Sequence, residues 1–139
     1  MPKSRPAETS VVTAFVTKGD RVLLLKRSAL VGSYRGQWAG VSGYLETDEP
    51  IEQAWVELRE ELGAGKIDTT LEAVGEPFSV KDEAKNRAWC VHPFRFSLAE
   101  DFEPKLDWEH IELKWILPTE MKDMDTVPGL WKAWCRVAK

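Results

Sequence analysis

The chain has 139 residues, 43% of them apolar, and a formal net charge of −4. This length suits one compact domain, residues 1–139, that buries its own core, and it is short for two. The acidic balance excludes general nucleic-acid binding and binding to anionic membranes, because both need a clustered positive field.

The polar start of the chain and its few cysteines indicate where the protein works. Residues 1–10 are polar and include prolines, and no apolar run approaches the length of a membrane span. With only two cysteines, Cys90 and Cys135, the chain lacks the dense disulfide framework of small secreted domains. We therefore expect a soluble cytoplasmic protein with two reduced thiols and a flexible N-terminus over residues 1–9.

The first half of the sequence predicts strands followed by one helix. We expect a β-hairpin of residues 11–16 and 22–25 around a turn at residues 18–20, a loop over residues 28–37, and a short strand broken by glycines over residues 38–45. Residues 50–62 then carry apolar residues at three- and four-residue spacing. This pattern predicts a helix that begins at Pro50 and is ended by Gly63 and Gly65.

The second half predicts further strands and a terminal helix. We expect strands at residues 71–80 and 88–96 around a charged turn at residues 81–87, and a half-buried strand on which Ile111, Leu113 and Trp115 alternate with polar residues. Pro128 opens a helix whose apolar face carries Leu130, Trp131, Trp134 and Val137. The two tryptophans seal either the core of the monomer or the interface of a homodimer, and the sequence leaves both alternatives open.

Three carboxylates share one side of the predicted helix over residues 50–62. At 100° per residue, Glu57, Glu60 and Glu61 fall within an arc of about 100° beside the apolar arc. Like charges at this spacing repel by a few tenths of a kcal/mol per pair, roughly, so they do not help an isolated helix. Carboxylates grouped in this way suit Mg²⁺ or Mn²⁺, whose remaining positions take water and phosphate oxygens. The alternative is a solvated face made of glutamates that simply favour helix.

The wider sequence context favours the metal site. The segment Gly43-Tyr-Leu-Glu-Thr-Asp-Glu49, followed by Val56-Glu-Leu-Arg-Glu-Glu-Leu-Gly63, resembles the Nudix box. That box has the pattern Gly, five residues, Glu, seven residues, Arg-Glu, aliphatic, any, Glu-Glu, any, Gly, aliphatic. The resemblance implies a Nudix (MutT-like) α/β/α sandwich with a central mixed β-sheet. It also implies a Mg²⁺- or Mn²⁺-dependent hydrolase that cuts a diphosphate linkage in a nucleoside diphosphate derivative by water attack at phosphorus.

The same resemblance implies roles within the box. Glu57, Glu60 and Glu61 are expected as metal ligands or general base, the Gly43 carbonyl as a further ligand, Glu49 as the brace of the loop before the helix, and Gly63 as a structural residue. Glu49 also has a purely structural explanation, because an acidic residue ahead of Pro50 favours the positive end of the helix.

Candidate residues also lie outside the box. Family members often add a carboxylate from a later loop, and Glu109, just before the strand around Leu113, is the candidate here, whereas Glu112 is expected on the surface. Arg27 is the candidate for phosphate contact, and Tyr34 and Trp38 are candidates for lining the substrate pocket. His110 is expected to have a structural role rather than to act as a base or phosphate partner.

Departures from the box leave alternative functions open. Six residues rather than seven separate Glu49 from Val56, which stands where the family has an Arg that pairs with the box glutamates, and Ala64 replaces the larger terminal aliphatic residue. Arg59 lies on the opposite side of the helix from Glu57, so a basic group from elsewhere is needed.

Because of these departures, a catalytically weak domain that binds a nucleotide or a partner protein is one alternative to the hydrolase. The other is an isopentenyl-diphosphate isomerase-like enzyme. It ranks last, because residues 38–43 lack the cysteine that such an enzyme needs.

Overall fold

The structure is a computed structural model that describes residues 8–139. The strands are β1 (Glu8–Lys18), β2 (Arg21–Arg27), β3 (Trp38–Ala39), β4 (Val41–Tyr44), β5 (Thr69–Val74), β6 (Phe78–Asp82), β7 (Arg87–Leu98) and β8 (His110–Ile116). The helices are α1 (Pro50–Leu62) and α2 (Leu130–Cys135), with two 3₁₀ turns, η1 (Lys66–Asp68) and η2 (Pro118–Asp123). Of the N-terminus expected to be flexible over residues 1–9, residues 1–7 lie outside the described range. For Glu8 and Thr9 the expectation is wrong, because both belong to β1.

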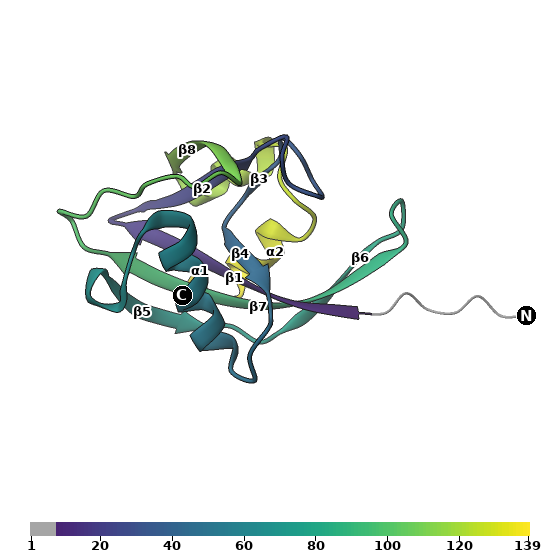
Figure 1. Ribbon diagram of the computed structural model, residues 1–139, viewed down its shortest axis with the longest axis horizontal. Helices are drawn as coiled ribbons and strands as arrows, with labels where there is room; N and C mark the ends of the chain where they lie inside the picture. Colours follow the sequence, from purple (N-terminus) through teal and green to yellow (C-terminus); the bar gives the residue numbers. More distant parts are fainter. Residues whose placement is uncertain (1–7) are drawn as a thin grey trace, which may run out of the picture.

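Strand β1 is the centre of a mixed sheet (Figure 1). Along one edge it pairs in parallel with β7, from Glu8 opposite Ala88 to Thr17 opposite Ser97. Its other edge is divided, because β4 pairs antiparallel with residues 11–14 and β2 pairs antiparallel with residues 17–18. Strands β3 and β8 extend the sheet from β2, and β5 and β6 extend it from β7. Since β2 and β4 leave β1 at different points, the sheet opens between them.

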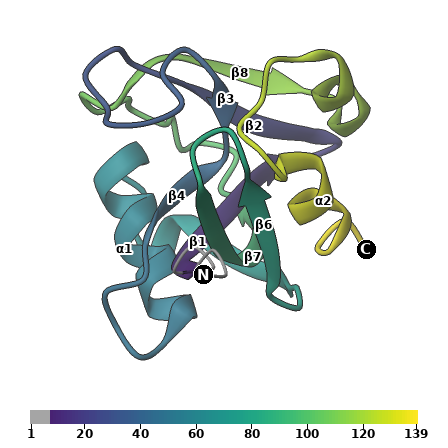
Figure 2. The same ribbon diagram turned by 90° about the vertical axis from the view of Figure 1, so that its right-hand side faces the viewer.

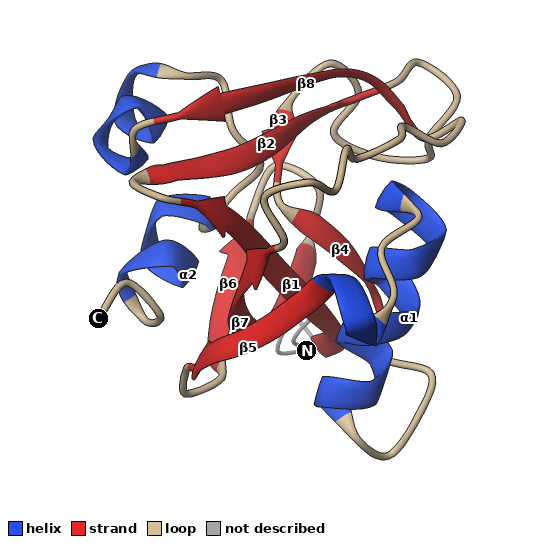
Figure 3. Cartoon of the chain, turned by 90° about the vertical axis from the view of Figure 1, so that its left-hand side faces the viewer, coloured by secondary structure: helices blue, strands red, loops and turns tan. Residues whose placement is uncertain are grey.

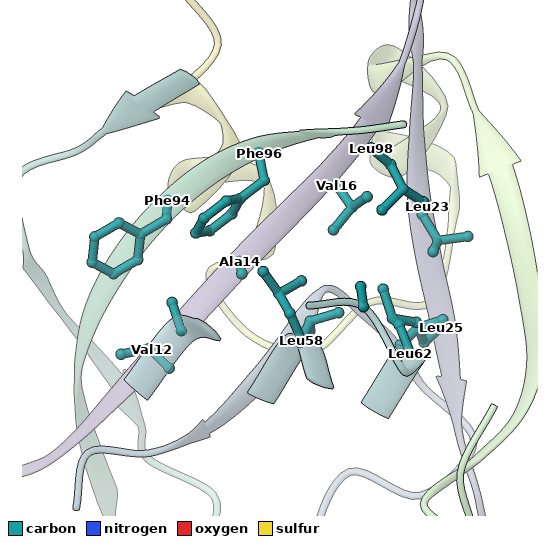
Figure 4. Close-up of a cluster of buried hydrophobic side chains, with 13 residues drawn as sticks. Val12, Ala14, Val16, Leu23, Leu25, Leu58, Leu62, Phe94, Phe96 and Leu98 are labelled. Atoms are coloured by element: carbon teal, nitrogen blue, oxygen red, sulfur yellow. The ribbon is translucent and has the colours of Figure 1, made fainter. Parts of the chain in front are cut away.

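The two helices lie on opposite sides of the strands, as Figures 2 and 3 show from opposite directions. Side chains alternate along β1, so Val12, Ala14 and Val16 belong to the core on the α1 side, whereas Phe15 belongs to the core on the α2 side. Figure 4 shows the first core, where Leu58 of α1 meets β1. Burying one such leucine contributes roughly 1.5–3 kcal/mol. The α/β/α sandwich with a central mixed β-sheet is thus confirmed.

Helix α1 begins and ends where the sequence predicts. Pro50 occupies the first turn, and Gly63 ends the helix with φ 75° and donates its N–H to the Arg59 carbonyl over 3.0 Å. The apolar residues Ala54, Leu58 and Leu62 are fully buried. This packing fixes the rotation of α1 and therefore the direction of its acidic side.

Helix α2 seals the second core. The Trp134 ring meets Phe15 edge-on at 5.4 Å between centroids and is 8% exposed, which supports the monomer-core alternative for this residue. The helix begins at Leu130 rather than at Pro128, because Gly129 has φ 81° and therefore lies in the left-handed region, outside the helix. Within residues 8–139, neither helix has the length and apolarity needed to cross a membrane.

Two strand predictions need correction. Residues 71–80 do not form one strand, since β5 ends at Val74 and β6 begins at Phe78. Both strands pair with β7, and the break includes Pro77, which has no N–H for a ladder hydrogen bond. On β8, Leu113 and Trp115 pack partly against the core as expected, but Ile111 is 61% exposed. The alternation therefore fails at the start of that strand, where Glu112 is exposed as predicted.

Candidate active site

A cleft of about 270 Å³ lies beside α1 and is lined by residues of β1, β4 and β7, and by segments near the end of β2 and the start of β8. Its lining includes two groups of distinct chemistry. The charged group consists of Arg27, Glu46, Glu57 and Glu109. The aromatic group consists of Tyr34, Tyr44 and Trp89. A cleft with both kinds of lining suits a ligand that has an anionic part and a planar part.

Glu57 extends from α1 towards β4, where Gly43 leaves no room for a side chain. A Cβ atom at position 43 would overlap the Glu57 carboxylate. Among the described residues, Glu57 Oε2 is buried and finds no hydrogen-bond partner. Burial raises the Glu57 pKa from 4.5 to about 7, and the charges of Glu60 and Glu109 act in the same direction. The glycine thus lets a carboxylate sit where it is poorly solvated.

Glu61 is more deeply buried and faces a histidine. Its side chain and that of His110 are each 2% exposed, and 3.5 Å separates Glu61 Oε1 from His110 Nε2. The other ring nitrogen, His110 Nδ1, lies 3.0 Å from Asp107 Oδ1. Burial raises the pKa of Glu61 well above its ordinary value and lowers the pKa of His110. Within residues 8–139, Glu61 Oε2 also has no hydrogen-bond partner.

The segment before β8 brings Glu109 to the cleft, opposite the end of β2. Burial raises the Glu109 pKa, the charge of Asp107 raises it further, and the guanidinium of Arg27 opposes both effects. Arg27 is held by its own Nε, which donates to the Ser33 carbonyl over 2.9 Å. Arg27 is therefore a basic group from outside α1 whose charge acts on the site. The helix itself has Val56 where the family pattern has an arginine.

A hydrogen bond joins two members of the aromatic group, Trp89 and Tyr34, and a ring contact adds Tyr44. Trp89 Nε1 donates to Tyr34 Oη over 3.2 Å, and Tyr34 Oη donates to Asp82 Oδ2 over 2.8 Å. The Tyr44 ring lies 6.3 Å from the Trp89 ring at an interplanar angle of 31° and is 52% exposed. Tyr44 therefore presents apolar surface to solvent at the cleft.

The remaining predicted residues lie in different places. Glu60 is exposed on α1, close enough to raise the Glu57 pKa. Trp38 lies outside the lining of the cleft and packs against the α2-side core. Glu49 occupies the N-cap position of α1, but its side chain makes no capping hydrogen bond. The loop before α1 is braced instead by Gln53, whose Oε1 accepts the Glu46 N–H over 3.1 Å.

Sequence reasoning missed several of these residues for identifiable reasons. Tyr44 and Trp89 were two aromatics among many, and only the pairing of β1 with both β4 and β7 makes them neighbours. Gln53 is polar but 4% exposed, and its position among the apolar residues of α1 was the available signal. His110 was expected to have a structural role, but its contacts were not predicted; the available signal was Asp107 three residues earlier, a spacing at which the two side chains meet here.

The carboxylates fit a hard divalent cation as a donor set. Within residues 8–139, no three histidine, cysteine, aspartate or glutamate side chains converge as a preformed metal site. Glu57 and Glu61 nevertheless each carry a buried oxygen without a partner, and unpaired buried carboxylates are unfavourable unless something compensates their charge. Oxygen ligands of this type are those that Mg²⁺ and Mn²⁺ prefer.

Comparison with known proteins identifies the family. A model of the NUDIX domain matches residues 7–135, almost the whole chain. The chain belongs to the Nudix family. This result confirms the family and the hydrolase class that the box of residues 43–63 implied. A search of curated proteins finds no significant match.

Solved structures share the Nudix fold at low sequence identity. A MutT protein from Methanosarcina mazei Go1 is 22% identical with a TM-score of 0.72, over 94% of this chain and 91% of that one. A C. elegans Ap4A hydrolase in a binary complex is 18% identical with a TM-score of 0.68, over 92% and 93%. The NUDIX domain of Shewanella oneidensis NrtR, complexed with ADP ribose, is 14% identical with a TM-score of 0.68, over 91% and 83%. At these identities the similarity establishes the fold alone.

Proposed function

We propose that this Nudix protein is a divalent-metal-dependent hydrolase that cuts the diphosphate linkage of a nucleoside diphosphate derivative by water attack at phosphorus. The observation that carries the proposal is a pair of buried carboxylate oxygens, on Glu57 and Glu61, that have no hydrogen-bond partner in the described part of the chain and lie next to a cleft that also contains Arg27. Such oxygens are costly to bury without a cation, and a cleft that combines a cation with an arginine suits a diphosphate.

Each charged residue has a separate task in this proposal. Glu57 and Glu61, with Glu60 and the Gly43 carbonyl, hold Mg²⁺ or Mn²⁺. When bound, the ion neutralises the diphosphate and makes a water molecule more acidic. Arg27, fixed through Ser33, contacts the phosphate oxygens. Glu109 faces the cleft with a raised pKa, which suits a carboxylate that accepts the proton of the attacking water.

The aromatic group supports a nucleoside as the other part of the substrate. Tyr34, Tyr44 and Trp89 offer ring surface in the same cleft, and stacking on aromatic rings is a common way to bind a base. Among similar folds, one protein is named as an Ap4A hydrolase and another is bound to ADP ribose, and both compounds are nucleotide derivatives. These names give the first compounds to test.

The test is phosphate-product release from nucleoside triphosphates, nucleotide sugars, ADP-ribose and dinucleoside polyphosphates, with Mg²⁺, with Mn²⁺ and with chelator. Glu57→Gln and Glu61→Gln keep the side-chain shape and remove the charge, so each is expected to lower kcat by about 100-fold or more. Glu83→Gln, in the exposed turn between β6 and β7, is the matched control and should leave kcat unchanged. Turnover that persists in chelator would contradict the metal's role. No turnover with retained nucleotide binding would favour a binding module.

A further inference from the structure

Three side chains, Asp107, His110 and Glu61, contact one another in series between the start of β8 and α1, and the last two are buried. His110 is the middle member, with Nδ1 3.0 Å from Asp107 Oδ1 and Nε2 3.5 Å from Glu61 Oε1. The side chains of His110 and Glu61 are each 2% exposed, and that of Asp107 is 17% exposed. The imidazole therefore links two acidic groups away from solvent.

The anchor of this chain is firmly held. Asp107 Oδ1 also accepts the Glu109 N–H over 3.2 Å, which closes the turn before β8. Ser28, just after β2, donates its Oγ to the Trp108 carbonyl over 3.1 Å and its N–H to the Glu109 carbonyl over 2.7 Å. The turn that carries His110 is thus fastened to a second element, so the ring has little freedom to shift relative to α1.

Glu61 depends on a fixed polar partner more than the other glutamates of α1 do, because it is the most deeply buried of them. A buried carboxylate that is free to rotate has several unfavourable orientations, and a fixed polar partner selects one of them. The contact to His110 engages Oε1, and within the described residues 8–139 Oε2 is left without a hydrogen-bond partner. The residue preceding Glu57 on α1 is Val56, an aliphatic side chain that has no hydrogen-bonding group to offer the helix glutamates.

We propose that His110 is a positioning residue that fixes the Glu61 carboxylate through Nε2, with Asp107 as the anchor of the ring. This inference rests on the proposed function, because it takes Glu61 as a metal ligand. His110 is not among the residues that line the cleft, so it acts through Glu61 and not on the substrate itself. Its effect is to hold one oxygen of Glu61 so that the other is presented for ligation, as outer polar partners of metal ligands do.

Two substitutions of His110 distinguish a role in positioning the Glu61 carboxylate from a role in packing alone. In His110→Gln, the side-chain amide nitrogen reaches about as far as Nε2 and can still contact Glu61. In His110→Asn, the amide reaches only as far as Nδ1 and can contact Asp107 but not Glu61. Both variants are polar at a site that is 5% exposed, but Asn is one methylene group shorter than Gln, so the Tm of each variant is compared to separate a packing loss from a lost contact.

The experiment measures Mn²⁺ affinity by electron paramagnetic resonance without substrate, and kcat with the best diphosphate substrate. His110→Asn should weaken Mn²⁺ binding by about 10- to 100-fold and lower kcat by a similar factor. His110→Gln should stay within about threefold of the wild type in both. Equal losses in the two variants, or no loss in His110→Asn, would overturn the proposal, and so would a wild type that binds no Mn²⁺.

A second variant covers the case in which His110→Asn does not fold, as judged by circular dichroism and Tm. Asp107→Asn keeps an acceptor oxygen near Nδ1 but removes its charge, and it should weaken Mn²⁺ binding by about threefold to tenfold. Unchanged affinity in this variant would overturn the role of the anchor. If the wild type hydrolyses no diphosphate but the Mn²⁺ affinities still follow this order, the proposed function fails and the positioning role stands.

Discussion

At the scale of single residues, the acidic groups of the cleft are held in an unfavourable state. Glu57 is partly buried and Glu61 almost completely buried, and the pKa of each is raised because burial disfavours the charged form. Neighbouring carboxylates add repulsion in the same direction. The site therefore lowers the stability of the cation-free protein near neutral pH. Such a cost is typical of a cluster of charges that a bound ligand compensates.

The raised Glu57 pKa predicts how the free energy of unfolding changes with pH. The folded-state pKa is about 7 against an ordinary value of 4.5, so between these values the folded protein holds more protons than the unfolded chain. The free energy of unfolding therefore falls as pH rises through this window. Because solvent reaches part of the Glu57 side chain and screens its charge, the free energy of unfolding should fall by only about 1–2 kcal/mol across this window. Glu57→Gln, neutral at every pH, should remove this fall.

Denaturant unfolding in chelator, at pH 4 and at pH 8, measures this effect. Glu57→Gln and the wild type should be equally stable at pH 4, and the variant should be the more stable of the two at pH 8. Glu83→Gln, whose side chain is exposed, should stay within about 0.5 kcal/mol of the wild type at both values. A wild type that is as stable as Glu57→Gln at pH 8 would contradict the burial of a charged Glu57.

Gly43 offers a second prediction at this scale. A Cβ at position 43 would overlap the Glu57 carboxylate, so Gly43→Ala should displace that side chain and lower kcat by about 10- to 100-fold. The atoms that the Cβ would meet are the far end of the flexible Glu57 side chain, which can swing away, so the free energy of unfolding should change little. Gly32→Ala is the control, because a Cβ there meets no heavy atom within 4 Å. Wild-type kcat in Gly43→Ala would show that the Glu57 position is not limiting.

The sequence predicted which residues share the acidic side of α1 better than it predicted the contacts that other elements make with that side. The three glutamates share a helix whose periodicity is visible in the sequence, so their common side follows from geometry alone. The contact between His110 and Glu61 joins residues of two elements that are far apart in the chain, and no local pattern encodes it. A histidine beside a strand start carries little information until its neighbours in space are known.

At the scale of elements, predictions succeeded where the termination signal lay in the chain itself. Helix α1 matches its predicted bounds because Pro50 and Gly63 set its ends locally. The prediction over residues 71–80 failed because the separation of β5 from β6 depends on how each pairs with β7, which is a tertiary property. The late start of α2 likewise reflects the left-handed backbone of Gly129.

The end of α1 can be tested directly. Gly63 has φ 75°, where a side chain is strained, so Gly63→Ala should lower the free energy of unfolding by about 1–2 kcal/mol. Gly65→Ala is the matched control two residues later. Gly65 has φ −94°, and a Cβ there would make only ordinary contact, so its effect should be within about 0.5 kcal/mol. Equal losses in the two variants would contradict the capping role of Gly63.

At the scale of the whole molecule, the cleft exists because β1 shares one of its edges between two strands. Strand β4 pairs with residues 11–14 and places Gly43 beside α1. Strand β2 pairs with residues 17–18 and ends at Arg27, which also lines the cleft. The family resemblance implied an α/β/α sandwich. Which residues meet in the cleft became clear only from the way β2 and β4 share one edge of β1. The residues that line the cleft are therefore spread over most of the chain, and the charge that they concentrate is a property of the fold.

This concentrated charge links cation binding to global stability. A ligand that binds only the folded state at 100 times its Kd adds about 2.7 kcal/mol to the free energy of unfolding, which raises Tm by roughly 5–10 °C for a chain of this size. Saturating Mn²⁺ should produce such a shift in the wild type at pH 8. In the double variant Glu57→Gln with Glu61→Gln, the shift should disappear, because the two unpartnered carboxylates are gone. A shift of the same size in the double variant would show that Mn²⁺ binds elsewhere, and no shift in either protein would show that the buried carboxylates do not gather a cation.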